Sequence, residues 1–186
     1  MAVLRSFVGI SLDMTIARQI DSALEPIKAA DQQQSIRWVP IRNWHVTLAF
    51  LGDQTEEQLA LLPDYLATSL FDTDEMNIRL SRIDMFPDAH SRIVAAWVAA
   101  TPELNLLHQR VHQAVDSLGM ITDDTQAFLP HITLGRIKKD RSAIIASQTL
   151  SHEFRVKHIS VFQSQRTHQG SIYTTLASVS LETSFR

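Results

Sequence analysis

Hydrophobic positions at the start of the chain change from a strand pattern to a helix pattern. Residues 3–12 form a β-prone apolar run and are expected to be the first strand. Apolar residues then recur at helical spacing, at Ile16, Ile20, Leu24 and Ile27. The pattern therefore predicts a strand followed by an amphipathic helix.

The next segments predict two strands and a second helix. A short strand is expected over residues 37–39, and a longer one over residues 44–51 that is closed by Gly52-Asp53. Thr55-Glu56-Glu57-Gln58 matches a capping box and predicts a helix start. Pro63 is expected to kink or split this helix, because proline has no backbone N–H to donate.

The second half of the chain repeats this alternation. Thr101-Pro102-Glu103 predicts another helix start, and Gly119 is the expected stop. The remaining elements expected here are strands over residues 76–85 and 92–99, an approach to a motif strand over 123–130, a short helix near 142–150, and final strands over 154–163 and 171–181 around a turn at 168–170. The order predicts an α+β chain in which residues 1–186 form one domain of two closely packed, pseudo-symmetric lobes.

One short pattern occurs twice, once in each predicted lobe. His45-Val46-Thr47-Leu48 recurs as His131-Ile132-Thr133-Leu134. Both copies are expected to be strands, in which alternate side chains point to opposite faces. The histidine and the threonine therefore share one face, and the aliphatic residues share the other. If the two strands face each other, they line a cleft with two histidines and two threonines.

This set of side chains suits acid–base chemistry on a phosphate. Imidazole has an unperturbed pKa near ~6.5, so one ring can be neutral and the other protonated near neutral pH. The threonine hydroxyls can donate hydrogen bonds to phosphoryl oxygens. A protonated imidazole also provides positive charge to a developing transition state.

Composition excludes several other classes of site. The chain has no cysteine, so disulfides, thiol catalysis and cysteine-ligated zinc are excluded. No segment approaches the ~20 apolar residues of a membrane span, and no signal peptide is expected at the N-terminus. The net charge of −3 argues against a surface that coats nucleic acid broadly, but it permits recognition of one RNA end. A cytoplasmic, monomeric protein is expected.

The two motif regions resemble the paired signature of the 2H phosphoesterases. The segments that carry the resemblance are residues 43–52, NWHVTLAFLG, and residues 128–136, FLPHITLGR. Within that superfamily they are similar to the bacterial RNA 2',3'-cyclic phosphodiesterases, also called 2'-5' RNA ligases. The similarity extends over most of the chain, including residues 7–10, 86–97 and 164–176.

The resemblance implies a fold and an activity. It implies a bilobal fold with two antiparallel sheets that face each other across a central cleft, with helices on the outside. It also implies hydrolysis of RNA 2',3'-cyclic phosphate ends, or of small cyclic nucleotides, to a 2'-phosphate without metal or cofactor, together with possible reversible 2'-5' RNA ligation. The resemblance favours His45 as the general acid and His131 as the general base, although the residues themselves fit either assignment, and it implies that Thr47 and Thr133 bind the phosphate.

The resemblance leaves two positions in doubt. Arg136 matches a basic residue of the family and is a candidate phosphate ligand. Strict strand alternation, however, points it with Ile132 and Leu134, away from His131, so that only a bulge or the end of the strand would bring it to the cleft. Gln165-Arg166 stands where family members often carry a Glu-Leu or similar pair, which puts nucleotide preference in doubt.

Other interpretations of the same residues remain open. The same fold could act on another cyclic phosphate or a 2'-5' linked nucleotide, or the protein could bind RNA ends without turnover. His108 and His112 share a helix face at a spacing that can bind zinc, but a solvated face is favoured because no third ligand is evident. Four aromatic residues could stack on a base, although core packing is favoured for each: Phe7, Trp44, Phe50 and Phe128.

Overall fold

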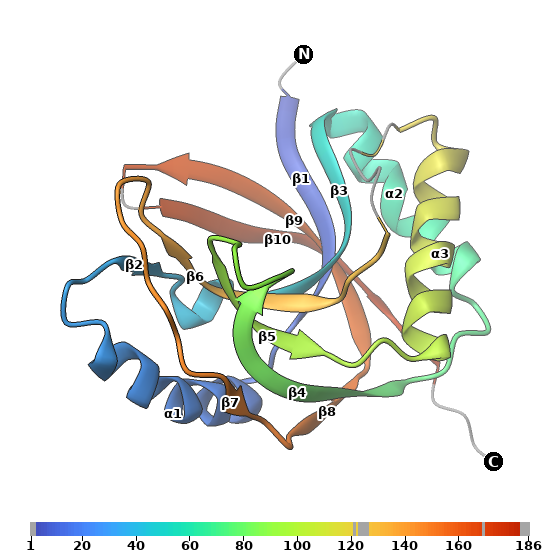
Figure 1. Ribbon diagram of the computed structural model, residues 1–186. Coiled ribbons are helices and arrows are strands. Elements are labelled where there is room, and N and C mark those ends of the chain that lie inside the picture. Colours follow the sequence, from blue (N-terminus) through green and yellow to red (C-terminus); the bar gives the residue numbers. More distant parts are fainter. Residues whose placement is uncertain (1–2, 121, 123–126, 169, 183–186) are drawn as a thin grey trace.

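A computed structural model describes residues 3–120, 122, 127–168 and 170–182. Within these residues the fold is α+β, with one large antiparallel sheet and three α-helices (Figure 1). The strands are β1 (Val3–Ser11), β2 (Ile36–Trp38), β3 (His45–Thr55), β4 (Met76–Phe86), β5 (Ile93–Val98), β6 (His131–Ile137), β7 (Gln148–Thr149), β8 (Glu153–Val156), β9 (His158–Thr167) and β10 (Gly170–Ser180). The helices are α1 (Met14–Ala30), α2 (Glu56–Ser69) and α3 (Pro102–Ser117), with a short 3-10 helix over Ile41–Asn43.

The sheet has two halves, one for each predicted lobe. Its strand order is β10-β9-β1-β3-β6-β5-β4-β7, and two further strands pair outside this order, β2 with β6 and β8 with β4. The halves meet between the two motif strands, where Val46 of β3 pairs with Ile132 of β6. The α+β class with antiparallel strands is confirmed, and the two expected sheets are joined by hydrogen bonds at this point.

Helices α2 and α3 begin where their capping signals predict, and each of the three α-helices has a side-chain N-cap. The Asp13 side chain accepts hydrogen bonds from Thr15 and Ile16 at the start of α1, and Thr55 forms the expected capping box with Gln58 at the start of α2. Thr101 caps α3 in the same way. In Figure 1, α2 and α3 pack together at one side of the sheet, away from α1.

The structure differs in detail from two expectations for the first half. Helix α2 is not split at Pro63, and one helix runs from Glu56 to Ser69. Strand β3 does not close at Gly52-Asp53 but continues to Thr55 as the partner of β1. Gly52 has a φ of 66°, which lets the strand pass this position with a distorted backbone.

The second half departs from expectation at two places. No helix forms over residues 142–150, where Ala143 and Ile145 contact the core while Ile144 is fully exposed. This period of two leads into the short strand β7, which pairs with β4. The predicted strand over 154–163 is divided in two, because β8 pairs with β4 whereas β9 pairs with β1. The expected approach at 123–126 and turn residue 169 lie outside the described residues.

Candidate active site

The repeated motifs lie on the two strands that join the sheet halves. His45, Thr47, His131 and Thr133 are all half-buried. The aliphatic residues between them are buried in the core: Val46, Leu48, Ile132 and Leu134. Because β3 and β6 are antiparallel and Val46 pairs with Ile132, the histidine of each motif lies across from the threonine of the other. The structure thus brings together the four residues that the repeated pattern singled out.

Both histidines are held by the same backbone device. Nδ1 of His45 lies 2.6 Å from the carbonyl oxygen of Asn43, and Nδ1 of His131 lies 2.9 Å from the carbonyl oxygen of Leu129. A carbonyl oxygen can only accept, so Nδ1 carries the hydrogen in each ring. Nε2 is therefore the atom that gains or loses a proton, and in the neutral ring it is an acceptor.

Aromatic rings surround both imidazoles. The Phe7 ring lies 4.6 Å from the His45 ring, and the Tyr173 ring meets His45 edge-on at 5.2 Å, both measured between centroids. Phe86 stacks on His131 at 3.8 Å. These contacts fix the ring planes and exclude water from one side of each imidazole.

This burial shifts the titration of both rings. The pKa of His45 is lowered from 6.5 to about 4, mainly by desolvation and in smaller part by the charge of His131, while the Asn43 carbonyl opposes the shift. Desolvation also lowers the pKa of His131; the Leu129 carbonyl opposes this shift, and the charge of Arg136 adds to it. The two rings therefore interact electrostatically, and a proton on one disfavours a proton on the other.

A β-bulge in each motif strand changes which side chains reach the cavity beside His45. In the pairing of β3 with β1, Leu48 is an extra residue between Thr47 and Ala49. In the pairing of β6 with β5, Leu134 is the extra residue between Thr133 and Gly135. A bulge interrupts the alternation of side chains. Two positions beyond each bulge, an exposed side chain therefore lines the cavity.

These exposed residues are Phe50 in β3 and Arg136 in β6. Strict alternation would point Arg136 away from the cavity, and the bulge at Leu134 turns it toward the cavity. The preference for core packing of Phe50 was wrong, since its side chain is 49% exposed. Trp44 is buried in the core as favoured, and Phe128 packs partly against the core. Phe7 is buried but lines the cavity beside His45.

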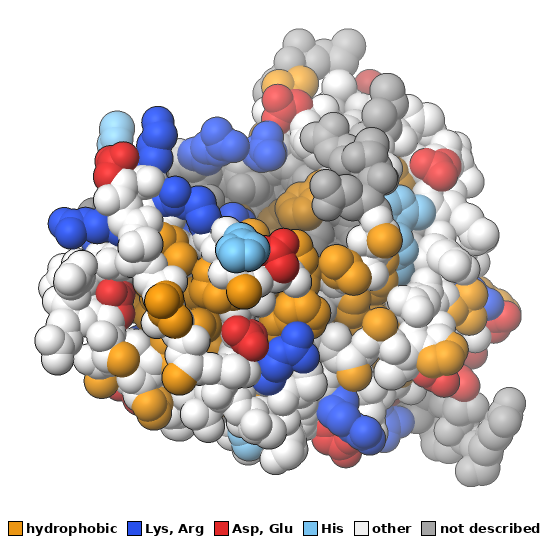
Figure 2. All heavy atoms as spheres, viewed as in Figure 1, with side chains coloured by type: hydrophobic (Ala, Val, Ile, Leu, Met, Phe, Trp, Pro, Cys, Tyr) orange, Lys and Arg blue, Asp and Glu red, His pale blue; other side chains and the backbone are white. Residues whose placement is uncertain are grey.

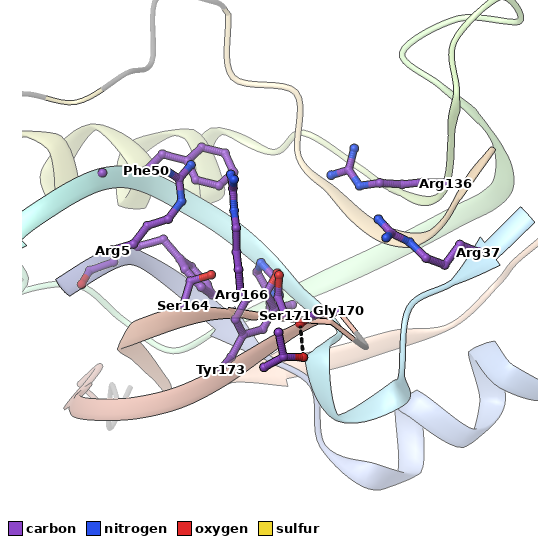
Figure 3. Close-up of a pocket in the computed structure, with 14 residues that line it drawn as sticks. Arg5, Arg37, Phe50, Arg136, Ser164, Arg166, Gly170, Ser171 and Tyr173 are labelled. Atoms are coloured by element: carbon purple, nitrogen blue, oxygen red, sulfur yellow. Dashed lines mark hydrogen bonds between the residues drawn. The ribbon is translucent and has the colours of Figure 1, made fainter. Parts of the chain in front are cut away.

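The cavity next to His45 has a volume of about 630 Å³ (Figure 3). Four arginines from four strands line it: Arg5 (β1), Arg37 (β2), Arg136 (β6) and Arg166 (β9). No aspartate or glutamate is among its described lining residues. Figure 2 shows a corresponding group of Lys and Arg side chains on this part of the surface. The cavity is therefore built for an anion, although the whole chain is acidic.

Sequence reasoning found only one of these arginines as a ligand candidate. Arg5, Arg37 and Arg166 have no motif in common and come together only through the pairing of distant strands. The nearest signal was the Gln165-Arg166 departure from the family pattern. Phe86 and Tyr173 were noted for their resemblance alone, and their contacts with the histidines appear only in the structure.

The solvated helix face expected at His108 and His112 is not observed. Both are half-buried, with ring centroids 4.3 Å apart. His108 stacks on Phe128, and Nε2 of His112 lies 3.2 Å from the carbonyl oxygen of Leu48. Among the described residues there is no group of three histidine or acidic side chains that could hold a metal. The pair instead packs helix α3 against strand β3.

The helices also lack the length and hydrophobicity of membrane spans. In the described part of the chain, every helix is too short or too polar to cross a bilayer.

Comparisons with known proteins identify relatives that match most of the chain. The chain is 30% identical over 186 residues to an RNA 2',3'-cyclic phosphodiesterase of Aquifex aeolicus, covering 95% of this chain and 96% of the relative. It is 28% identical over 179 residues to an RNA 2',3'-cyclic phosphodiesterase of Archaeoglobus fulgidus, covering 93% and 98% of the two chains.

Solved structures share the fold. A Thermus thermophilus protein, TT0787, superposes with a TM-score of 0.79 at 25% identity, covering 97% of this chain and 99% of the other. LigT of E. coli, crystallised with 3'-AMP, superposes with a TM-score of 0.79 at 22% identity, covering 96% and 98%. The model of the family described as LigT like Phosphoesterase matches residues 10–97 and 98–173, so that each matched segment contains one histidine–threonine motif. The chain belongs to the LigT-like phosphoesterase family, within the 2H phosphoesterases.

Proposed function

We propose that this protein hydrolyses the 2',3'-cyclic phosphate end of RNA to a 2'-phosphate, with His45 and His131 as acid and base. The observation that carries the proposal is that the two imidazoles have matching surroundings. Each Nδ1 is bound to a backbone carbonyl, and each histidine lies next to a motif threonine at the junction of the sheet halves. The relatives' names, RNA 2',3'-cyclic phosphodiesterase, support this choice of substrate.

The reaction needs one proton to be taken and one to be given. A water oxygen attacks phosphorus while Nε2 of His131 takes its proton, and the bond from phosphorus to the 3' oxygen breaks. Nε2 of His45 gives a proton to the departing 3' oxygen, which becomes a hydroxyl. The product carries the phosphate on the 2' oxygen. If the 5' hydroxyl of a second RNA takes the place of the attacking water, the same step with the same roles joins the two ends by a 2'-5' bond. The histidines exchange roles when that bond is cleaved again by attack of the 3' hydroxyl.

Desolvation, the largest cause for both rings, favours their neutral forms and lowers the pKa of His45 to about 4, so that His45 acts as the acid only with the help of the bound phosphate. Arg136 disfavours a charge on His131 and so favours the neutral form that a base requires. While His131 is neutral, its charge no longer lowers the pKa of His45. The negative phosphate of a bound substrate raises the pKa of His45 as well, so that His45 can hold the proton that the acid must give.

The phosphoryl oxygens need donors that stay in place as charge develops. Thr47 and Thr133 each lie across from a histidine and can donate their hydroxyls to the non-bridging oxygens. Arg136 reaches the cavity through its bulge and adds positive charge beside His131. These three residues therefore hold the reacting phosphate, and the two imidazoles move the protons.

A substrate panel tests the proposal. We would assay 2',3'-cyclic mononucleotides, 3',5'-cyclic nucleotides and RNA with a 2',3'-cyclic end, with and without EDTA. Hydrolysis of the 2',3'-cyclic compounds in EDTA is expected, because two imidazoles supply both acid and base. Hydrolysis of 3',5'-cyclic nucleotides alone would show that the site acts on another class of substrate. Tight binding of RNA ends without turnover would support a binding module, and a strict requirement for added metal would reject the two-histidine reaction.

A further inference from the structure

The positive charge of the cavity exceeds what one reacting phosphate requires. A cyclic phosphodiester carries a single negative charge. Arg5, Arg37, Arg136 and Arg166 all line the cavity, and none of them forms an ion pair with another described residue. Unpaired like charges repel one another, so a ligand with more than one anionic group fits this cavity better than a single anion.

Two of these arginines form a pair on one wall of the cavity. Arg37 of β2 and Arg136 of β6 are directly opposite in the antiparallel register, and both are exposed. Like charges at such positions destabilise a sheet unless something neutralises them. Figure 3 shows both side chains extending into the cavity from the same side. Since Arg136 also acts on His131, this pair belongs with the reacting phosphate.

The other two arginines lie on the opposite wall. Arg5 comes from β1 and Arg166 from β9, two strands that pair with each other, and both side chains are exposed. Figure 3 places them across the cavity from Arg37 and Arg136, beside Ser164. A volume of about 630 Å³ is within the range of sites that hold a ligand of nucleotide size.

We propose that Arg5 and Arg166 form a second phosphate subsite, which binds a phosphate of the substrate other than the cyclic one. The substrate class is then a nucleotide or RNA end that bears a phosphate on the 5' side of its terminal nucleoside. The phosphate can belong to the preceding phosphodiester of an RNA chain or to a free 5'-phosphate. The proposal rests on the proposed function, since it requires the cyclic phosphate to lie at the histidines.

Three substrates test this subsite. They are adenosine 2',3'-cyclic phosphate, the same nucleoside with an added 5'-phosphate, and a diadenosine whose 3' end is the cyclic phosphate. The wild-type protein is expected to show a kcat/KM at least about tenfold higher for a substrate with the second phosphate, as a charged hydrogen bond is worth that much. The 5'-phosphate and the diadenosine distinguish a terminal phosphate from a chain phosphodiester as the group that binds.

Substitutions then locate the effect. Arg5→Gln and Arg166→Gln are each expected to reduce the ratio of kcat/KM with and without the second phosphate by about tenfold, mainly through KM. Arg18→Gln, an exposed arginine on α1 outside the cavity, is the matched control and should keep the wild-type ratio. Equal kcat/KM for all three wild-type substrates would overturn the subsite and leave the proposed function intact. No hydrolysis of any of them would instead reject the proposed function.

Discussion

Leu48 and Leu134 are corresponding bulge residues in the two motif strands. Each is skipped in the pairing with the neighbouring strand, and each is followed two positions later by a side chain that lines the cavity. The two lobes thus use one backbone device for different purposes, an aromatic ring at Phe50 and a cation at Arg136. This relationship supports our proposal that residues 1–186 act as one domain of two pseudo-symmetric lobes.

The second bulge depends on the absence of a side chain at Gly135. A Cβ at this position would lie 2.7 Å from Cγ2 of Ile36 and 2.8 Å from Cε3 of Trp38. Gly135→Ala is therefore expected to lower the free energy of unfolding by about 1–3 kcal/mol and to reduce turnover, because Arg136 is the next residue. Denaturant unfolding and steady-state kinetics measure both effects.

Trp38→Leu makes room for the added methyl group and supplies the control. In that background, Gly135→Ala should cost less stability than in the wild type, since the crowding with the indole is removed. Additive losses in the double variant would show that the bulge does not depend on this contact.

Removal of either imidazole should abolish most of the activity. His45→Ala and His131→Ala are each expected to reduce kcat by about 10²–10⁴-fold, the usual value of a general acid or base. The double variant should be little worse than the poorer single one, because the pair works as a unit. His158→Ala, at an exposed position, serves as the control in the same assay. Near-normal hydrolysis by either single variant would show that the substituted histidine is neither the acid nor the base.

The threonines should have smaller effects. Thr47→Val and Thr133→Val keep the β-branched shape of the side chain but remove one phosphate donor each. We expect kcat/KM to fall by less than in the histidine variants, with little change in thermal stability. Kinetics together with thermal melting separate the two effects. If both variants kept full activity, the hydroxyls would have no part in holding the phosphate.

The lowered pKa values predict an acid-shifted pH profile for kcat/KM, which reports the free enzyme. The acid must be protonated and the base neutral, so the bell-shaped profile should have its maximum between about 4, the pKa of His45, and 6.5, the ordinary value. Above the maximum the rate should fall, because the acid loses its proton. The profile of kcat should lie at higher pH, since bound phosphate raises both values. A kcat/KM profile centred above pH 7 would contradict the burial argument.

The position of the product phosphate is a separate prediction. Cleavage of the bond between phosphorus and the 3' oxygen leaves a 2'-phosphate. If the ribose were tilted, the same four motif residues could instead cleave the bond to the 2' oxygen. The walls of the cavity, including Phe50 and Tyr173, must therefore fix the pose. Phosphorus NMR of the product from a 2',3'-cyclic nucleotide is expected to show the 2'-phosphate alone. A dominant 3'-phosphate signal would mean that the ribose binds in the other orientation.

The sequence by itself determined the parts of this protein that depend on local signals. Helix starts at Thr55 and Thr101 follow from side chains that cap the backbone within one turn. The placement of each motif histidine beside its threonine follows from strand alternation over three residues. The repetition of that motif was sufficient to identify the family, because each copy matches the family signature separately.

Only the tertiary structure decided what distant strands place together. The bulges at Leu48 and Leu134 arise from the register with neighbouring strands, which no local pattern encodes. For the same reason the predicted helix over 142–150 was wrong: pairing with β4 overrides local propensity there. The order of the strands brings three distant arginines to one cavity: Arg5, Arg37 and Arg166. Their combined charge depends on distance in space and not on separation along the sequence.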